Sequence, residues 1–297
     1  MSERPGPIFV GGLSHTGKTE VRIILGAHPD LSMTRGTSLW DRHYGRYGDL
    51  NVAGNLDRCL RAVANDPAAA VLGPDPDRLR RDVRDGRVTY ALLFGLVHEH
   101  HADRLGKGRW GEQLRGIERF ARPIFDAFPT ARMIHMIRDP RSELREERRR
   151  PGAVGWSTAR WMRSAELAEA NLRRWEGRYR IIRYETLALS PAETMREVCA
   201  FVGVDFLPAM RDALASLRFA PTEPVPVGSQ EPARSARAFV DRYAGRDLRR
   251  FDYAAATPRG TAAGRGALAL VERGVERASM TAWRLLEGRA VVRSERT

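Results

Sequence analysis

Short apolar runs alternate along this chain with longer stretches in which apolar residues recur every three or four positions. Short runs bounded by polar or turn residues are typical of buried parallel strands, and they occur at residues 8–10, 31–34, 132–137 and 180–184. Helical spacing occurs at residues 20–27, 55–64, 77–84, 89–101, 115–127, 159–175 and 191–202. Strands that alternate with helices predict an α/β fold, with a mainly parallel central sheet flanked by helices.

The same pattern predicts how the chain is divided. No clear strand occurs between about residues 41 and 128, so we expect a helical layer there that shapes a second substrate pocket. Residues 220–232 have the composition of a loop. We expect one α/β domain over residues 1–253, a small-residue linker at 254–266 and an amphipathic helix within 267–297. That helix would dock on the domain, contact another subunit or lie on a membrane surface.

Charge narrows the class of partner. The chain has 297 residues and a formal net charge of +13, which favours nucleotides, phosphorylated or sulfated compounds, nucleic acid or acidic membranes as partners. The arginines are spread along the chain and do not form one basic arm. We therefore expect an anionic small-molecule ligand and no specific nucleic-acid site.

The cysteines and the apolar stretches indicate the compartment. Cys59 and Cys199 are far apart in the sequence and give neither a zinc spacing nor a disulfide framework, which favours a reducing compartment. The first residues lack a hydrophobic signal region, and the apolar stretch at 88–97 is too short to span a bilayer. We expect a cytoplasmic protein.

A phosphate-binding turn is predicted where the first strand ends. Residues 12–19 read Gly-Leu-Ser-His-Thr-Gly-Lys-Thr, between the apolar run and the first helix. Glycines let a backbone wrap a phosphate, and the first amides of a helix attract negative charge. Lys18 is one of only two lysines, against 48 arginines, so its place in this turn is informative.

A second anion site is predicted at the end of the run 132–137. A nucleoside triphosphatase or kinase needs a carboxylate for magnesium at such a strand end. Here the first polar residue is Arg138, followed by Asp139, Pro140 and Arg141. Two cationic strand ends side by side would suit a nucleotide that is charged at both its 5′ and its 3′ end.

Three blocks of sequence carry a resemblance to a known family. The first is residues 10–33 with the loop His-Thr-Gly-Lys-Thr at 15–19, the second is residues 128–141 with Arg-Asp-Pro-Arg, and the third is Arg-Tyr-Glu-Thr-Leu at 183–187 followed by residues 191–203. In this order and spacing the blocks resemble the sulfotransferases that use 3′-phosphoadenosine 5′-phosphosulfate (PAPS). The resemblance implies transfer of a sulfuryl group to a hydroxyl or amine of a small molecule, lipid or glycan, with no metal required.

The resemblance also implies roles for particular residues. The loop would hold the 5′-phosphosulfate through Ser14, His15, Thr16, Gly17, Lys18 and Thr19. Lys18 or His15 would neutralise charge on the bridging oxygen as it leaves. Arg138 would bind the 3′-phosphate, assisted by Ser142 and by Arg234.

The chain departs from the family pattern at several positions. Glu146 stands where the family commonly has a Ser that contacts the 3′-phosphate, and Gln113 stands where it usually has a Lys. The lysine of the loop occupies the family's Thr position, and His15 replaces its first basic residue. These departures leave two alternatives open, an ATP-dependent P-loop kinase or nucleoside triphosphatase and a PAPS-binding protein without turnover.

The catalytic base is not fixed by the motifs. Related enzymes often have a Glu near the position of Gly36, and this chain has none there. The nearest groups that could take a proton from an acceptor are Asp41, His43 and Glu112, of which we select Asp41. The histidines at 98, 100 and 101 could suggest a metal, but the apolar helix around them favours packing or surface roles.

Overall fold

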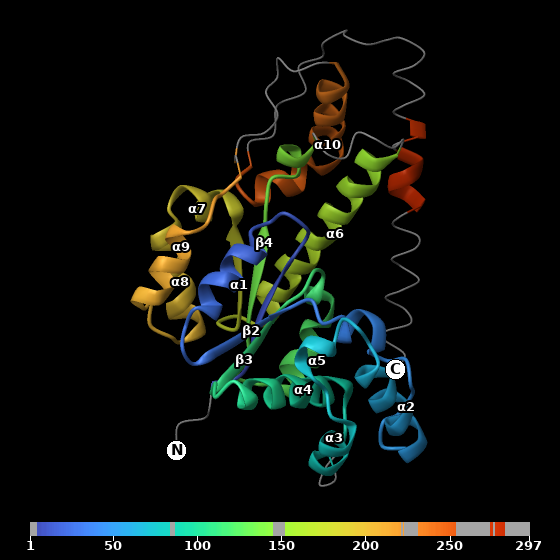
Figure 1. Ribbon diagram of the computed structural model, residues 1–297. Helices are drawn as coiled ribbons and strands as arrows, with labels where there is room; N and C mark the ends of the chain where they lie inside the picture. The colour runs from blue at the N-terminus through green and yellow to red at the C-terminus, as the bar shows by residue number, and fades with distance from the viewer. Residues whose placement is uncertain are drawn as a thin grey trace.

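The computed structural model describes residues 5–83, 87–144, 152–220, 222, 231–253, 274–275 and 277–282. Their centre is a five-stranded sheet in the order β2-β3-β1-β4-β5, in which all four strand pairs are parallel (Figure 1). The strands are β1 (Ile8–Gly12), β2 (Leu31–Arg35), β3 (Arg109–Gln113), β4 (Arg132–Ile137) and β5 (Tyr179–Arg183). The predicted α/β fold with a parallel central sheet is confirmed.

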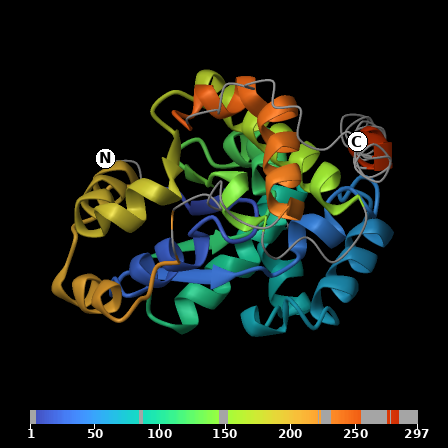
Figure 2. The same cartoon turned by 90° about the horizontal axis from the view of Figure 1, so that it is seen from above.

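Helices cover both faces of the sheet. They are α1 (Lys18–Gly26), α2 (Ala53–Ala64), α3 (Pro76–Asp82), α4 (Tyr90–Arg104), α5 (Ala121–Ala127), α6 (Ala153–Arg174), α7 (Tyr184–Leu189), α8 (Pro191–Val202), α9 (Pro208–Ala215) and α10 (Glu231–Arg250). Seen from above, α8 and α9 lie at one flank of the molecule and α2 lies at the other (Figure 2).

Side-chain alternation along β1 divides the core between these two layers. Ile8 and Val10 face the layer of α1, α8 and α9, while Phe9 between them faces the layer of α2, α4 and α5. Phe9 meets Trp110 edge-on, with ring centroids 5.5 Å apart. A fully buried parallel strand has apolar side chains on both faces, which is why its sequence is a continuous apolar run.

The strand β3 was not predicted, because residues 41–128 were expected to be helical. It lies between β1 and β2, although three of its five residues are polar or charged. Two of its polar side chains are buried and form hydrogen bonds. Arg109 donates to the carbonyl of Val202 at 2.6 Å, and Glu112 accepts from Thr37. Hydrogen bonds to distant residues thus replace the apolar pattern by which a buried strand is recognised.

The chain beyond β5 departs from the prediction in a second way. Most of residues 220–232, which were expected to form a loop, lie outside the described residues, but their last two positions belong to α10, which begins at Glu231 and packs against α6 in a shared apolar cluster. The predicted linker 254–266 and most of the segment 267–297 lie outside the described residues. Within that segment Ser279 donates to the carbonyl of Gly152 at 2.7 Å and Met280 is buried. None of the helices described is long and apolar enough to cross a membrane.

Candidate active site

The turn after β1 is held in a conformation that requires glycine. Gly12 has a φ of 112°, and a side chain there would collide with the carbonyl of Met136 on β4. Gly17 has a φ of 87°, and a Cβ there would lie 2.8 Å from the ring of Tyr184. L-residues rarely adopt such angles. The two glycines therefore keep the turn pressed against β4 and α7 while α1 begins at Lys18.

Lys18 places its charge inside this turn. Its side chain is buried, its Nζ donates to the carbonyl of Leu13, and it lies 3.5 Å from Oγ1 of Thr16. Thr16 donates to the same carbonyl at 2.8 Å. An anion held by the turn would meet a lysine that is already oriented by these contacts.

Arg138 comes from the end of β4 to the same turn. Its guanidinium donates to the carbonyl of His15 at 3.0 Å and lies 4.3 Å from the centre of the Tyr184 ring. Its own carbonyl accepts from the indole of Trp161 at 2.9 Å. The structure thus brings His15, Lys18 and Arg138 together, because the carboxyl ends of parallel strands meet at one edge of the sheet.

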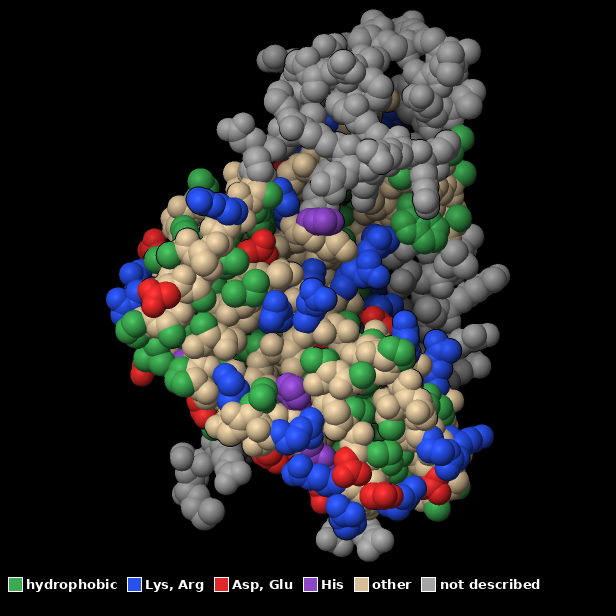
Figure 3. Space-filling model, in the orientation of Figure 1, with side chains coloured by type: hydrophobic (Ala, Val, Ile, Leu, Met, Phe, Trp, Pro, Cys, Tyr) green, Lys and Arg blue, Asp and Glu red, His purple; other side chains and the backbone are tan. Residues whose placement is uncertain are grey.

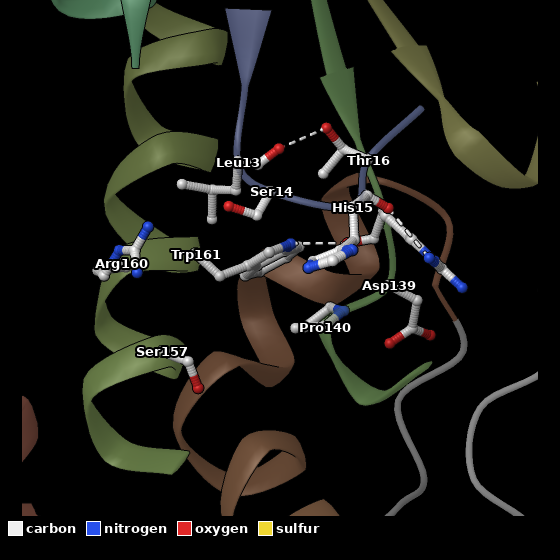
Figure 4. A pocket seen from close by; sticks show the side chains of 10 residues that line it. Leu13, Ser14, His15, Thr16, Asp139, Pro140, Ser157, Arg160 and Trp161 are labelled. Atoms are coloured by element: carbon white, nitrogen blue, oxygen red, sulfur yellow. Dashed lines mark hydrogen bonds between the residues drawn. The ribbon is translucent and has the colours of Figure 1, made fainter. Parts of the chain in front are cut away.

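A cavity of about 240 Å³ lies between this turn and α6. Its walls are residues 13–16 of the turn, residues 138–140 after β4, and Ser157, Arg160 and Trp161 of α6 (Figure 4). The α6 residues were not predicted as part of the site. Their spacing of three and four positions places them on one face of the helix, which is the signal that could have found them.

A second cavity, of about 600 Å³, lies on the other side of the turn. It is lined by residues 14–20, by Gln113 at the end of β3 and by Arg115 just beyond it. Ser14, His15 and Thr16 line both cavities. The turn is therefore a shared wall, with Arg138 on one side and Lys18 on the other.

Three other residues of the predicted phosphate site lie differently. The hydroxyl of Ser142 donates to the carbonyl of Asp139 at 2.8 Å, and Ser142 lines neither cavity. Arg234 lies in the first turn of α10, and its side chain is outside the described residues. Glu146, the departure from the family's Ser, is also outside them.

Asp41 is the accessible one of the three candidate bases. It lies on a π-helical turn (Leu39–His43) held by the buried Trp40, and its side chain is 38 % exposed. Burial raises the pKa of Asp41, although Arg119 and Arg115 act in the opposite direction. Asp41 lines neither cavity, but Arg115 beside it lines the second one.

The other two candidates are engaged elsewhere. Both ring nitrogens of His43 have partners, Asp66 at 2.8 Å and Tyr47 at 2.7 Å. Glu112 is fully buried, where Thr37 donates to it and His98 lies 3.4 Å away. Burial raises the pKa of Glu112, but His98 and the hydrogen bonds outweigh burial and the pKa is lowered. Neither side chain is open to an acceptor.

A buried carboxylate behind the turn was missed in the sequence. Glu118 accepts from Ser164 at 2.8 Å and from the amide of Gly12 at 3.4 Å, and His135 lies 4.0 Å from it. The pKa of His135 is lowered by burial, and the charge of Lys18 contributes to the same direction. Glu118 therefore ties the first glycine of the turn to α6.

The histidines of α4 do not converge on a common point. His98 pairs with Glu112, and His100 lies 2.7 Å from Asp82. Across the described ranges there is no group of three or more His, Cys, Asp or Glu side chains that could hold a metal ion.

Comparisons with known proteins agree with this geometry. Residues 7–208 match the sequence model of the sulfotransferase family, and no curated protein matches. The sulfotransferase domain from the curacin biosynthetic pathway is 18 % identical, with 86 % of this chain and 100 % of that chain covered and a TM-score of 0.50.

Two further solved structures are more distant in shape. The sulfotransferase domain of the Synechococcus PCC 7002 olefin synthase is 16 % identical over 92 % of this chain and 95 % of that one, with a TM-score of 0.47. A sulfotransferase from Alicyclobacillus acidocaldarius is 18 % identical, with 84 % of this chain and 95 % of that chain covered and a TM-score of 0.46. Because the family match spans the whole sheet and both cavities, the chain belongs to the sulfotransferase family and is a transferase.

Proposed function

We propose that this protein transfers a sulfuryl group from PAPS to a hydroxyl or amine of a small molecule, lipid or glycan. One observation carries the proposal: Lys18 and Arg138 bring positive charge to a single glycine-bounded turn from two neighbouring strand ends. PAPS has negative charge at both its 5′ and its 3′ position. A pair of separate cationic sites matches that distribution better than it matches a mononucleotide.

The residues of the turn have roles in this proposal. Residues 14–19 hold the 5′-phosphosulfate, and Lys18 stabilises the bridging oxygen when its bond to sulfur breaks, with His15 as the exposed alternative. Sulfuryl transfer passes through a dispersed, in-line transition state, so positioning and fixed charge supply most of the rate. The acceptor oxygen or nitrogen bonds to sulfur, and Asp41 takes its proton.

The smaller cavity fits the other end of the donor. Arg138, after β4, lines it together with Ser157 and Arg160 of α6. Arginine side chains bind phosphate through two parallel hydrogen bonds. We assign the 3′-phosphate to this cavity, with Ser142 and Arg234 as further contributors that the sequence suggests.

The kinase or triphosphatase alternative is less well supported. Its magnesium would need an open carboxylate beyond β4, and the first one is Asp139. Both oxygens of Asp139 accept from the guanidinium of Arg141, at 2.9 and 2.6 Å, and the side chain is buried. The accessible carboxylate of Asp41 likewise supports turnover over a purely binding role. The free, buried thiols of Cys59 and Cys199 support a cytoplasmic site of action.

The proposal is tested by calorimetric titration of 3′,5′-adenosine bisphosphate without metal. We expect micromolar binding by the wild type and at least tenfold weaker binding by Arg138→Ala, with Arg211→Ala on α9 as a control that removes an exposed arginine elsewhere. ATP with magnesium should bind more weakly. Binding of ATP–magnesium alone, unchanged in Arg138→Ala, would show that the loop serves a triphosphatase or kinase.

A further inference from the structure

Four arginines follow the edge of the sheet beside the larger cavity, and we refer to them as the edge arginines. They are Arg22 on α1, Arg35 at the end of β2, Arg115 just after β3, and Arg119 on the turn Ile117–Phe120. Figure 3 shows Lys and Arg side chains in several groups over one face of the molecule, some of them near its middle.

The contacts of Gln113 and Arg115 place the edge arginines next to the reaction centre. Arg115 lines the same cavity as Lys18. Gln113, which also lines it, accepts from Arg22 at 3.2 Å and is the register partner of Arg35 on the adjacent strand. Arg115 therefore forms part of the cavity wall, and Arg22 and Arg35 lie behind that wall at Gln113.

Most of this positive charge is not compensated within the described part of the chain. Arg119 pairs with Asp41 at 3.2 Å. No described carboxylate forms an ion pair with Arg22, Arg35 or Arg115. Burial lowers the pKa of Arg22, and the neighbouring charge of Arg35 lowers it further. Like charges held this close repel one another, and an anion between them would remove the repulsion.

Of the carboxylates near the cavity, Asp41 pairs with Arg119 and its charge also acts on Arg115. Glu112 and Glu118 are buried and hydrogen-bonded to Thr37, to Ser164 and to the amide of Gly12. Glu20 also lines the cavity, and in the described part of the chain it forms no ion pair with an edge arginine. Arg115 on this wall, with Arg22 and Arg35 behind it, is therefore left without an ion pair among the described residues.

We propose that the acceptor is itself an anion, whose carboxylate or phosphate group is bound by Arg22, Arg35 and Arg115 while its hydroxyl or amine faces Lys18. This inference rests on the sulfotransferase function proposed above. In the reaction the acceptor atom bonds to sulfur, the bond from sulfur to the bridging oxygen breaks, the proton passes to Asp41, and 3′,5′-adenosine bisphosphate leaves. The anionic group of the acceptor takes no part in bond making; it fixes orientation and raises affinity.

The experiment compares pairs of acceptors with and without an anionic group. 4-Hydroxyphenylacetate is paired with 4-hydroxyphenylacetamide for the carboxylate arm, and glucose 6-phosphate with glucose for the phosphate arm. Each is titrated calorimetrically into protein saturated with 3′,5′-adenosine bisphosphate, and each is assayed with PAPS for sulfated product by mass spectrometry. We expect the anion of at least one pair to bind, or to react in kcat/KM, at least ten times better than its neutral partner.

Variants of the protein test whether the edge arginines cause the preference for the anionic acceptor. Arg115→Gln and Arg35→Gln should reduce the preference for the anion to about threefold or less, since each removes a charged hydrogen-bond donor. Arg35→Gln, at a residue that lines neither cavity, should bind 3′,5′-adenosine bisphosphate within about twofold of wild type. Arg211→Gln on α9 removes an exposed arginine at a distance and should retain the full preference.

The outcomes separate this inference from the proposed function. If 3′,5′-adenosine bisphosphate does not bind, the sulfotransferase proposal itself fails. If it binds but neither pair shows a preference for the anion in either assay, the anionic acceptor is overturned and the donor site stands. A preference that survives Arg115→Gln and Arg35→Gln would also overturn it, because the edge arginines would not be its cause.

Discussion

The guanidinium of Arg138 lies 4.3 Å from the centre of the Tyr184 ring, so that the ring covers one face of the cation. The Nη1 of Arg138 donates a hydrogen bond to the carbonyl of His15. Tyr184 follows β5 directly and is buried, and its hydroxyl donates to the carbonyl of Ala220 at 3.0 Å. The ends of β4 and β5 and the turn after β1 therefore fix the direction in which Arg138 points.

Replacing this ring should weaken nucleotide binding without removing any charge. A desolvated cation–π contact is worth about 1 to 2 kcal/mol, so Tyr184→Leu should bind 3′,5′-adenosine bisphosphate about tenfold more weakly in calorimetry. Tyr184→Phe keeps the ring and loses the hydrogen bond to Ala220, so its affinity should stay within about twofold while its stability falls by about 1 kcal/mol. Equal affinities for the Leu and Phe variants would contradict the orienting role of the ring.

Arg160 on α6 should discriminate between nucleotides with and without a 3′-phosphate. It lines the smaller cavity with Arg138 and Ser157. We expect Arg160→Gln to weaken binding of 3′,5′-adenosine bisphosphate by about tenfold or more, because one charge-assisted contact is lost, and to leave AMP within about twofold. The control is Arg163→Gln, which lies one turn further along α6 and pairs with Glu166. An equal loss for both nucleotides would assign Arg160 to the 5′ end.

The sheet was predictable wherever burial alone decided the sequence. The run 132–137 became β4 with the same bounds, and α8 runs from Pro191 to Val202 as its periodicity predicted. The strand β3 was missed because Arg109 and Glu112 are satisfied by residues far away in the chain. Such long-range hydrogen bonds leave no local pattern, so periodicity cannot detect them.

In the candidate site too, residues in local motifs could be predicted, and residues that depend on contacts with distant elements could not. His15, Lys18 and Arg138 could be named from motifs because each lies at a strand end, and parallel strands bring their carboxyl ends together. Arg160 was not named, because its spacing from Ser157 and Trp161 places the three on one face of α6 without saying which other element that face meets. Glu118 was missed for a similar reason, because its partners Gly12 and Ser164 come from other elements.

The ion pairs of Arg141 should stabilise the fold and not the reaction. Arg141 is 2 % exposed and contacts Asp139 at 2.6 Å and Asp241 of α10 at 2.8 Å. Arg141→Met would leave two buried carboxylates without that cation, at a cost of about 3 to 5 kcal/mol in the free energy of unfolding measured with urea. Arg163→Met breaks an exposed pair and should cost about 0.5 kcal/mol or less. Similar losses in both variants would contradict a special role for the buried contact between the turn after β4 and α10.

Asp41 should give the reaction its dependence on pH. Because burial raises its pKa more than Arg119 and Arg115 lower it, Asp41 takes up a proton above the ordinary value of about 4 for an aspartate. A base must be deprotonated to act, so kcat should fall as the pH drops through the raised pKa. Asp41→Asn should lower kcat by about 100-fold or more and remove this acid limb, with the affinity for 3′,5′-adenosine bisphosphate unchanged.

Stability provides an independent check on Asp41. A raised pKa means that the folded state holds the charged carboxylate less favourably than the unfolded chain does, so the cost is present at neutral pH and disappears as the pH falls below both pKa values. Thermal unfolding of Asp41→Asn should therefore occur at the same or a higher temperature than wild type at pH 7.5, with the difference smaller at pH 4. Asp126→Asn, in an exposed pair with Arg122, is the matched control and should change neither kcat nor the acid limb. An acid limb that persists in Asp41→Asn would assign the proton transfer to another group.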